Sequence, residues 1–249
     1  MRLHKFNIIN MVLMLSIPYI HASELNIAVA SNFATTAKQL AQIYHQTTGN
    51  NVVISSASTG TLYNQIKNGA PFAVLLSADT TTTAKLIADN LVIESSNYTY
   101  ATGRVVLWSK QANYVDNNGS ILKTQSYNHL AVANPKLAPY GAAGYQVINY
   151  FKLAEQLKTK IVTGDNINST YQLIASGNAE LGFVALAQIM RNGKITSGSA
   201  WVVPDNIATP IKQTAVVLTS AKNNPIAYDF MNFLKSSQAQ QIIHSYGYQ

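Results

Sequence analysis

The chain has 249 residues, 47% of them hydrophobic and 11% charged, which excludes an intrinsically disordered protein and suits one large domain or two modest ones. Its formal net charge is +7, but the basic residues are scattered along the chain, which argues against a nucleic-acid-binding protein and only weakly favours anionic partners. With no cysteine, the chain has no thiol nucleophile, no thiolate metal site and no lipid-anchored N-terminal cysteine.

The first 22 residues have the pattern of a signal peptide. Arg2 and Lys5 form a basic start, residues 8–20 are mostly apolar, and Ala22 offers a cleavage point. The apolar stretch is short for a membrane span of about 20 residues, so cleavage is favoured over an uncleaved anchor. Exported proteins without disulfides are common in a bacterial periplasm, and the missing lipid anchor favours the same location, so we expect a periplasmic protein.

Strand-length apolar segments alternate with helical segments through the first part of the mature chain. Strands are expected at residues 25–30, 52–55 and 73–77, and helical segments follow them. This alternation is typical of an α/β protein with a parallel sheet.

The same alternation returns in the second part of the chain. Further strands are expected at residues 105–108, 130–133, 161–163, 181–185 and 211–218, a long amphipathic helix at residues 142–157, and closing helices at residues 225–246. Because the α/β pattern occurs twice with no flexible linker, we expect two compact lobes joined by two crossing strands. Ligands of such sheets bind beyond the carboxyl ends of the strands.

Four loops that follow strands are candidates for a ligand site, at residues 31–32, 58–60, 139–141 and 165–168. Helix starts present unpaired N–H groups and a partial positive charge, so several converging starts could hold a dianion without Lys or Arg. Ser31 and Thr59 add hydroxyl donors. Each loop alone has a plainer interpretation, because Ser, Thr, Asp and Asn are the usual helix caps and glycines are ordinary turn residues.

Signals of an enzyme are weak. His45, His129 and His244 share no metal-ligand spacing, and the sequence contains no HExxH, GxSxG or P-loop motif. A secreted α/β hydrolase acting on phosphate esters would need a nucleophile beside a base or a metal, and it stays a weaker alternative. The residues alone favour an α/β binding protein for an anion, with a ligand-sensing module as a further alternative.

Six segments are spread over nearly all of the mature chain. In chain order they are Ala28-Val-Ala-Ser31, Ala57-Ser-Thr-Gly-Thr-Leu62, Gly69-Ala-Pro-Phe-Ala-Val-Leu-Leu-Ser-Ala-Asp79, Asn134-Pro-Lys-Leu-Ala-Pro-Tyr-Gly141, Gly182-Phe-Val-Ala-Leu186 and the ending from Ser237 to Tyr248. Together, in this order and spacing, they resemble the periplasmic molybdate-binding proteins of ABC transport systems. The resemblance implies an α/β clamshell of the type II periplasmic-binding-protein fold, in which each lobe is a mixed sheet flanked by helices. We expect residues 23–103 with 217–249 in the first lobe and residues 104–216 in the second.

The resemblance also implies a site for a tetrahedral oxyanion, molybdate or tungstate, held between the lobes by uncharged donors. Carried over position by position, Ser31 donates from its hydroxyl and backbone, Thr59 donates from its hydroxyl, and Asn32, Tyr140 and Ile167 donate from backbone N–H groups. No cofactor, and no metal beyond that of the anion, is expected. The expected partners are the permease and ATPase of an ABC importer, with the binding protein itself a monomer; sulfate or another tetrahedral oxyanion is the alternative ligand.

Two positions depart from the pattern of the family. Ala185 stands where many members have a Tyr, and the phenol of Tyr140 is a candidate replacement for that missing donor. Ala73 stands where an acidic residue is usual, and this change is expected to affect lobe packing or a surface contact rather than the anion site.

Overall fold

The computed structural model describes residues 24–249 as two sheets flanked by helices, and the predicted signal peptide lies outside the described residues. The first sheet has the strand order β2 (Asn51–Ala57), β1 (Glu24–Ala30), β3 (Val74–Ser77), β12 (Ile211–Val217) and β4 (Tyr98–Gly103). Strand β1 pairs in parallel with β2 and β3, whereas β12 is antiparallel to β3 and β4. The sheet is therefore mixed, as the resemblance implied.

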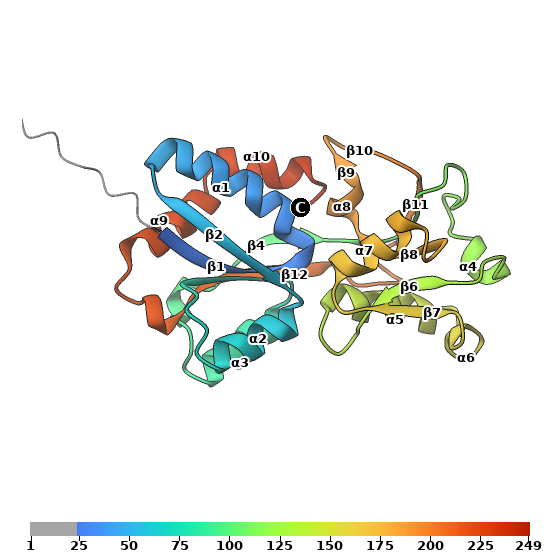
Figure 1. Ribbon diagram of the computed structural model, residues 1–249, viewed down its shortest axis with the longest axis horizontal. Helices are drawn as coiled ribbons and strands as arrows, with labels where there is room; N and C mark the ends of the chain where they lie inside the picture. Colours follow the sequence, from blue (N-terminus) through green and yellow to red (C-terminus); the bar gives the residue numbers. More distant parts are fainter. Residues whose placement is uncertain (1–23) are drawn as a thin grey trace, which may run out of the picture.

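Helices cover both faces of the first sheet (Figure 1). On one face lie α1 (Ala34–Thr48), α9 (Pro225–Leu234) and α10 (Ser237–Ser245), whose apolar residues share a core with alternate residues of β1. On the other face lie α2 (Thr59–Lys67) and α3 (Thr80–Ala88), which bury Leu62, Ile66 and Leu86 against Ala28. Successive side chains of a strand point to opposite faces, so β1 is apolar and buried from Ile27 to Ala30 because both faces are covered there.

The second sheet has the order β11 (Ser199–Val202), β5 (Val105–Ser109), β8 (Leu181–Ala185), β6 (Leu130–Ala133) and β7 (Ile161–Gly164). Helix α5 (Pro139–Tyr150) contributes to the core on one face, and α7 (Ile167–Ser176) contributes to the core on the other. The short elements are α4 (Ile121–Thr124), α6 (Ala154–Leu157), α8 (Leu186–Ile189), the hairpin of β9 (Met190–Arg191) and β10 (Lys194–Ile195), and the 3-10 turns η1 (Ser31–Phe33), η2 (Glu94–Ser96) and η3 (Thr219–Ala221). Two α/β lobes of this kind confirm the predicted fold class.

The chain passes between the sheets twice, after β4 and before β12. Strand β12 belongs to the first sheet, where Thr214 pairs with Ser77 and Ile211 pairs with Gly103. The predicted boundary between residues 216 and 217 gave nearly all of this strand to the wrong lobe, because the residue types of a strand do not reveal which sheet it joins. We therefore assign residues 24–103 with 211–249 to lobe 1 and residues 104–210 to lobe 2.

The long helix predicted at residues 142–157 is interrupted. Helix α5 ends at Tyr150 and α6 begins at Ala154, with Lys152 between them in the left-handed region at φ 57°. A non-glycine residue at positive φ marks a turn, and the spacing of the apolar residues in the sequence gave no sign of this turn.

Between residues 24 and 249, no helix combines the length and the hydrophobicity that crossing a membrane requires.

Candidate functional site

The five residues predicted to bind the anion all line one small pocket between the lobes. This interlobe pocket has a cavity volume of about 10 Å³, and it is lined by Ala30, Ser31, Asn32, Ser58, Thr59, Ala78, Ala138, Pro139, Tyr140 and Ile167. Ser31, Asn32 and Thr59 come from lobe 1, and Tyr140 and Ile167 come from lobe 2. Each of the five is at most 8% exposed, so the lobes enclose the pocket closely.

The lobe 1 side offers two hydroxyls. Ser31 follows β1, and in the described part of the chain its hydroxyl forms no hydrogen bond to protein and caps neither η1 nor α1. The Thr59 hydroxyl accepts the Ala78 N–H at 3.2 Å, which leaves its own proton for another acceptor. The cap of α2 is Ser58, which accepts the Thr61 N–H at 3.4 Å. The plainer interpretation of Ser31 and Thr59 as helix caps is therefore wrong.

The lobe 2 side offers backbone donors at two helix starts. Tyr140 is the second residue of α5 after Pro139, and Ile167 is the first residue of α7. The side chain of Asn166 caps α7 by accepting the N–H groups of Asn168 at 2.9 Å and Ser169 at 3.1 Å. The first N–H groups of a helix have no partner within it, and among residues 24–249 those of Tyr140 and Ile167 have no other backbone partner. Both are therefore available to a ligand in the pocket.

The pocket is electrically neutral but rich in donors. Among the described residues that line it, none is Lys, Arg, Asp or Glu. Hydroxyl and amide donors with the positive ends of helices suit a fully deprotonated anion, whereas a protonated anion also needs an acceptor for its proton. The chemistry of the pocket is therefore that of a site for a small dianion.

The Asn32 side chain is committed to the protein rather than to the pocket. Its Nδ2 donates to Gln213 Oε1 at 2.8 Å and to the Tyr248 hydroxyl at 3.0 Å, which uses both amide hydrogens. The Tyr248 hydroxyl donates back to the Asn32 carbonyl at 3.0 Å. These bonds occupy the side-chain amide of Asn32, so its backbone N–H is the group that could reach a ligand. Sequence reasoning missed Gln213 and Tyr248, because Gln213 stands between Lys212 and Thr214 in its strand and nothing in the residue types marks it as buried.

The phenol of Tyr140 lies against Gln213, whose Nε2 donates to it at 3.3 Å. Burial, the largest cause, raises the pKa of the Tyr140 hydroxyl well above its usual value, so the group stays protonated and neutral. A Cβ on Gly103 would overlap this hydroxyl, which shows how closely the backbone packs around it. These contacts favour a structural role for the phenol over donation to the anion.

The two positions that depart from the family pattern lie in the cores of the lobes. Ala185 ends β8, pairs with Val105 and is fully buried in the core of lobe 2. Ala73 is 8% exposed and packs in the core of lobe 1, where its N–H donates to the Asn26 carbonyl at 2.8 Å. An acidic side chain at this position would meet an apolar core in this protein.

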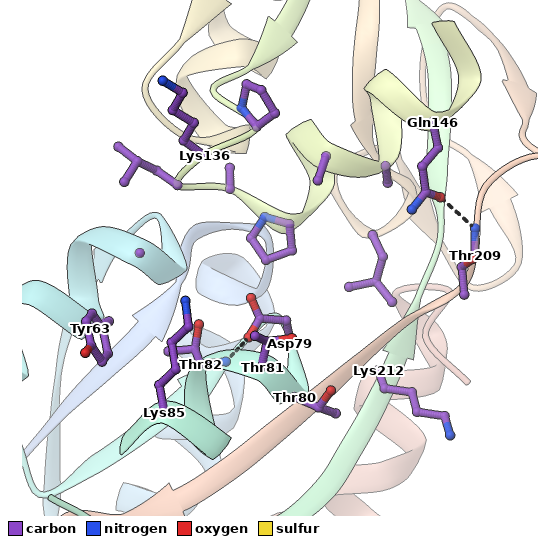
Figure 2. Close-up of a pocket in the computed structure, with 18 of the residues that line it drawn as sticks. Tyr63, Asp79, Thr80, Thr81, Thr82, Lys85, Lys136, Gln146, Thr209 and Lys212 are labelled. Carbon is purple, nitrogen blue, oxygen red and sulfur yellow. Dashed lines mark hydrogen bonds between the residues drawn. The ribbon is translucent and has the colours of Figure 1, made fainter. Parts of the chain in front are cut away.

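A larger groove adjoins the pocket on the outer side of the lobe boundary (Figure 2). It measures about 590 Å³ and shares Ala138 and Pro139 with the pocket. Three lysines line it, Lys85, Lys136 and Lys212, together with Asp79, whose carboxylate caps α3 by accepting the Thr82 N–H at 2.7 Å. The groove therefore has an excess of positive charge beside the uncharged pocket.

The lobes also touch directly at the edge of this groove. The Gly60 N–H at the start of α2 donates to the Leu137 carbonyl of lobe 2 at 2.9 Å. A Cβ on Gly60 would lie 3.1 Å from Leu137 Cα and Cδ2, which is closer than ordinary contact. This bond joins the two sides of the pocket directly.

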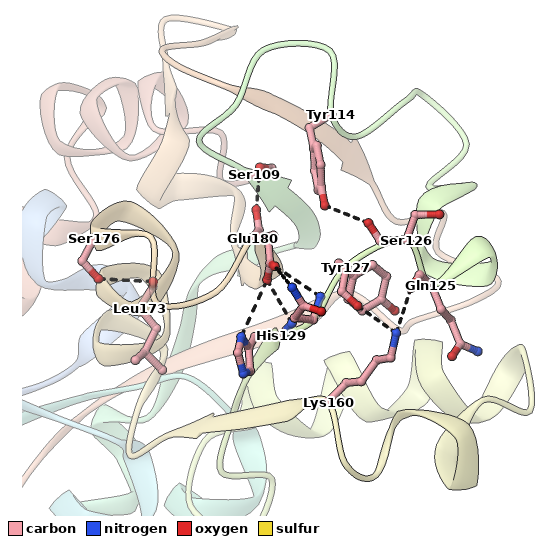
Figure 3. Close-up of polar contacts among 11 residues, drawn as sticks. Ser109, Tyr114, Gln125, Ser126, Tyr127, His129, Lys160, Leu173, Ser176 and Glu180 are labelled. Atoms are coloured by element: carbon pink, nitrogen blue, oxygen red, sulfur yellow. Dashed lines mark hydrogen bonds and ion pairs between the residues drawn. The ribbon is translucent and has the colours of Figure 1, made fainter.

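The histidines outside the predicted signal peptide make local contacts with the protein. Figure 3 shows Glu180 beside His129, where its carboxylate accepts the backbone N–H groups of His129 at 2.9 Å and Asn128 at 3.2 Å. Burial alone would raise the pKa of Glu180, but these backbone donors lower it. The ring nitrogens of His45 and His244 contact the backbone carbonyls of Asn50 and Tyr248. In the part of the chain that the structure describes, no group of three or more His, Asp or Glu residues could hold a metal ion.

Comparison with known proteins gives consistent results. The family model of the bacterial extracellular solute-binding proteins matches residues 25–249. The chain is 47% identical over 227 residues to the molybdate-binding protein ModA of Azotobacter vinelandii, covering 91% of this chain and 90% of that protein. It is 41% identical to ModA of Rhodobacter capsulatus over 91% of this chain and 88% of that protein. The structure is similar to that of the Azotobacter vinelandii periplasmic molybdate-binding protein, with a TM-score of 0.88 and 42% identity over 90% of this chain and 98% of that one.

Proposed function

This chain belongs to the family of bacterial extracellular solute-binding proteins, and we propose that it captures molybdate or tungstate between its lobes and delivers the anion to an ABC importer. The observation that carries the proposal is the interlobe pocket, which gathers donors from four separate loops without a charged side chain. The identity of 47% to a molybdate-binding protein over nine-tenths of both chains supports the same ligand. Export to the periplasm by an N-terminal signal peptide belongs to this proposal.

In the proposed complex, the hydroxyls of Ser31 and Thr59 and the N–H groups of Ser31, Asn32, Tyr140 and Ile167 donate to the oxygens of the anion. Hydrogen bonds to a charged group contribute about 1.5–3 kcal/mol each, and they are strongest where water is excluded. The starts of α5 and α7 add their partial positive charges from the opposite side. Capture and release follow from hinged closing and opening of the lobes, as in other proteins of this architecture.

Uncharged donors also provide selectivity. Phosphate near neutral pH carries a proton, and the proposed pocket offers that proton no carboxylate acceptor. Sulfate has no proton but is smaller than molybdate, so its oxygens would reach fewer of the donors at once. The proposal is therefore a site for large tetrahedral dianions, and a hydrolase is not favoured because the relatives are binding proteins.

Isothermal titration calorimetry with molybdate, tungstate, sulfate and phosphate tests the proposal directly. We expect tight binding of the first two anions and little affinity for the others, and equal affinity for sulfate would contradict the assignment.

Thermal unfolding gives a second test. A ligand at 1,000 times its Kd stabilises the folded state by about 4.1 kcal/mol. Each kcal/mol moves Tm by roughly 2–4 °C in a protein of this size, so molybdate at saturation should raise Tm by about 10 °C. Turnover of phosphate esters would instead support an enzyme.

A further inference from the structure

A buried amide joins the two lobes beside the interlobe pocket. Strand β12 returns from lobe 2 to lobe 1 beside β4 (Figure 1). Gln213 lies on this strand and is fully buried. The pairing of β12 with β4 shifts register between Gln213 and Thr214. Such a bulge re-aims a side chain, and here the side chain of Gln213 lies between residues of both lobes.

The Gln213 amide uses its oxygen for lobe 1 and its nitrogen for lobe 2. Gln213 Oε1 accepts from Asn32 Nδ2 at 2.8 Å and from the Tyr100 hydroxyl at 3.1 Å, and both of these residues belong to lobe 1. Gln213 Nε2 donates to the Tyr140 hydroxyl of lobe 2 at 3.3 Å. An amide is suited to this position because it combines an acceptor and donors in one planar group.

The space around this amide permits little movement. A Cβ on Gly103, which pairs with Ile211 where β4 and β12 run together, would lie 2.8 Å from Gln213 Nε2 and would overlap the Tyr140 hydroxyl. Asn32 is held from its other side by Tyr248. The side chains of Asn32 and Tyr140 therefore both bond to one amide, and both residues line the pocket.

We propose that Gln213 is a positioning residue of the anion site: by bonding to Asn32 of lobe 1 and Tyr140 of lobe 2, it sets the spacing of their two backbone donors. This inference rests on the proposed function, since it assigns the two backbone N–H groups to the anion. Gln213 does not itself line the pocket. Replacing Gln213 therefore changes anion binding only through Asn32 and Tyr140, to which its side chain bonds.

The test is a double-mutant cycle with Gln213→Met and Tyr140→Phe, followed by calorimetry and stopped-flow release of molybdate. Loss of a buried neutral hydrogen bond corresponds to about a five- to tenfold change in an equilibrium constant. We expect each single variant to weaken molybdate affinity by about this factor, mainly through faster release. Because both variants remove the same link, the double variant should bind no more weakly than the weaker single variant.

Tyr100→Phe is the matched control, because it removes a hydrogen bond from the same oxygen without touching a residue that lines the pocket. It should lower Tm yet bind molybdate within about twofold of wild type, since the spacing of the donors is unchanged. Tyr140→Phe loses only one hydroxyl, so it keeps the test valid if Gln213→Met folds poorly.

Several outcomes would overturn the inference. Wild-type affinity in Gln213→Met and Tyr140→Phe would reduce Gln213 to a core residue, and additive losses would indicate that the Tyr140 phenol contacts the anion itself. An equal loss of affinity in Tyr100→Phe would point to general loosening of the fold. A wild-type protein that binds neither molybdate nor tungstate would remove the proposed function, and the inference with it.

Discussion

The two sides of the interlobe pocket use different parts of the chain to present donors. Lobe 1 contributes the hydroxyls of Ser31 and Thr59, and neither of them is used as a helix cap. Lobe 2 contributes Tyr140 and Ile167 at the starts of α5 and α7, where the donors are backbone N–H groups and the side chains serve packing. Lobe 1 therefore adds side-chain donors, which depend on residue type, to its backbone N–H groups, whereas the donors of lobe 2 depend only on where two helices begin.

This difference predicts how each side responds to mutation. A side-chain donor is lost by a single conservative substitution, but a backbone donor survives any substitution that keeps the N–H and the helix start. Among the residue types, only proline lacks the backbone N–H. The protein tolerates a proline where the backbone conformation already suits it and its ring meets no other atom. The four predictions below test this contrast, from the largest expected effect to the smallest.

The largest effect is expected on lobe 1. Ser31→Ala and Thr59→Ala each remove a hydroxyl donor to a charged acceptor, a bond of roughly 1.5–3 kcal/mol. Each should weaken molybdate binding about ten- to hundredfold, as measured by calorimetry. Tm without ligand should stay within a few degrees of wild type in Ser31→Ala, because the Ser31 hydroxyl caps no helix and bonds to no described residue. Thr59→Ala should lower Tm further, because it leaves the buried Ala78 N–H without its acceptor. Unchanged affinity in both variants would remove the site assignment even though the fold is established.

On lobe 2, Ile167→Pro and Ile167→Val form a matched pair. Proline is favoured at the first position of a helix, and Asn166 before it already has the extended conformation that proline requires, at φ −151° and ψ 173°. Proline should keep α7 yet delete the donor, weakening molybdate binding about tenfold or more. Valine keeps the N–H and should bind within about twofold of wild type. Equal affinities for the two variants would show that this N–H does not contact the anion.

A smaller effect is expected where the lobes touch. Gly60→Ala places a Cβ 3.1 Å from Leu137 Cα, so the lobes must separate by a few tenths of an ångström to accommodate it. We expect roughly a three- to tenfold loss of molybdate affinity, through faster release measured by stopped flow. Stability without ligand should be unchanged or slightly higher, because alanine is the better helix former. A parallel loss of stability in the free protein would mean that the substitution disturbs α2 rather than closure.

The smallest expected effect is that of pH on the stability of the fold, and it involves tyrosines of both lobes. Burial raises the pKa of Tyr44 to about 12 and also raises those of Tyr98 and Tyr127, above the unfolded value of 10.0. An unfolded tyrosine therefore loses its proton before a folded one, so the stability is fully present below pH 10 and falls as pH rises through the folded pKa values. Thermal melts should be flat between pH 7 and 9 and should decline above pH 10. A decline that already begins near pH 8 would require a different titrating group.

Several parts of this structure could be predicted from residues alone. The mainly apolar segments at residues 25–30 and 73–77 correspond to β1 and β3. A run of apolar residues of strand length can be recognised without tertiary information. Ser31 and Thr59 could be selected because polar residues directly after a strand point to the edge where ligands bind. Family resemblance was needed for Tyr140 and Ile167, since a backbone donor leaves no signature in the type of its residue.

The amino-acid sequence by itself determined the alternation of strands and helices, the uncharged character of the pocket loops and the absence of thiol chemistry, because these depend on residue type and local spacing. Only the tertiary structure decided that β12 joins the first sheet, that Ser58 rather than Thr59 caps α2, and that Gln213 joins Asn32 to Tyr140. Asn32 and Gln213 lie 181 residues apart in the chain, and no local pattern relates them. Their contact exists because two lobes pack around the crossing strands, and packing over such separations follows from the whole fold rather than from any segment of it.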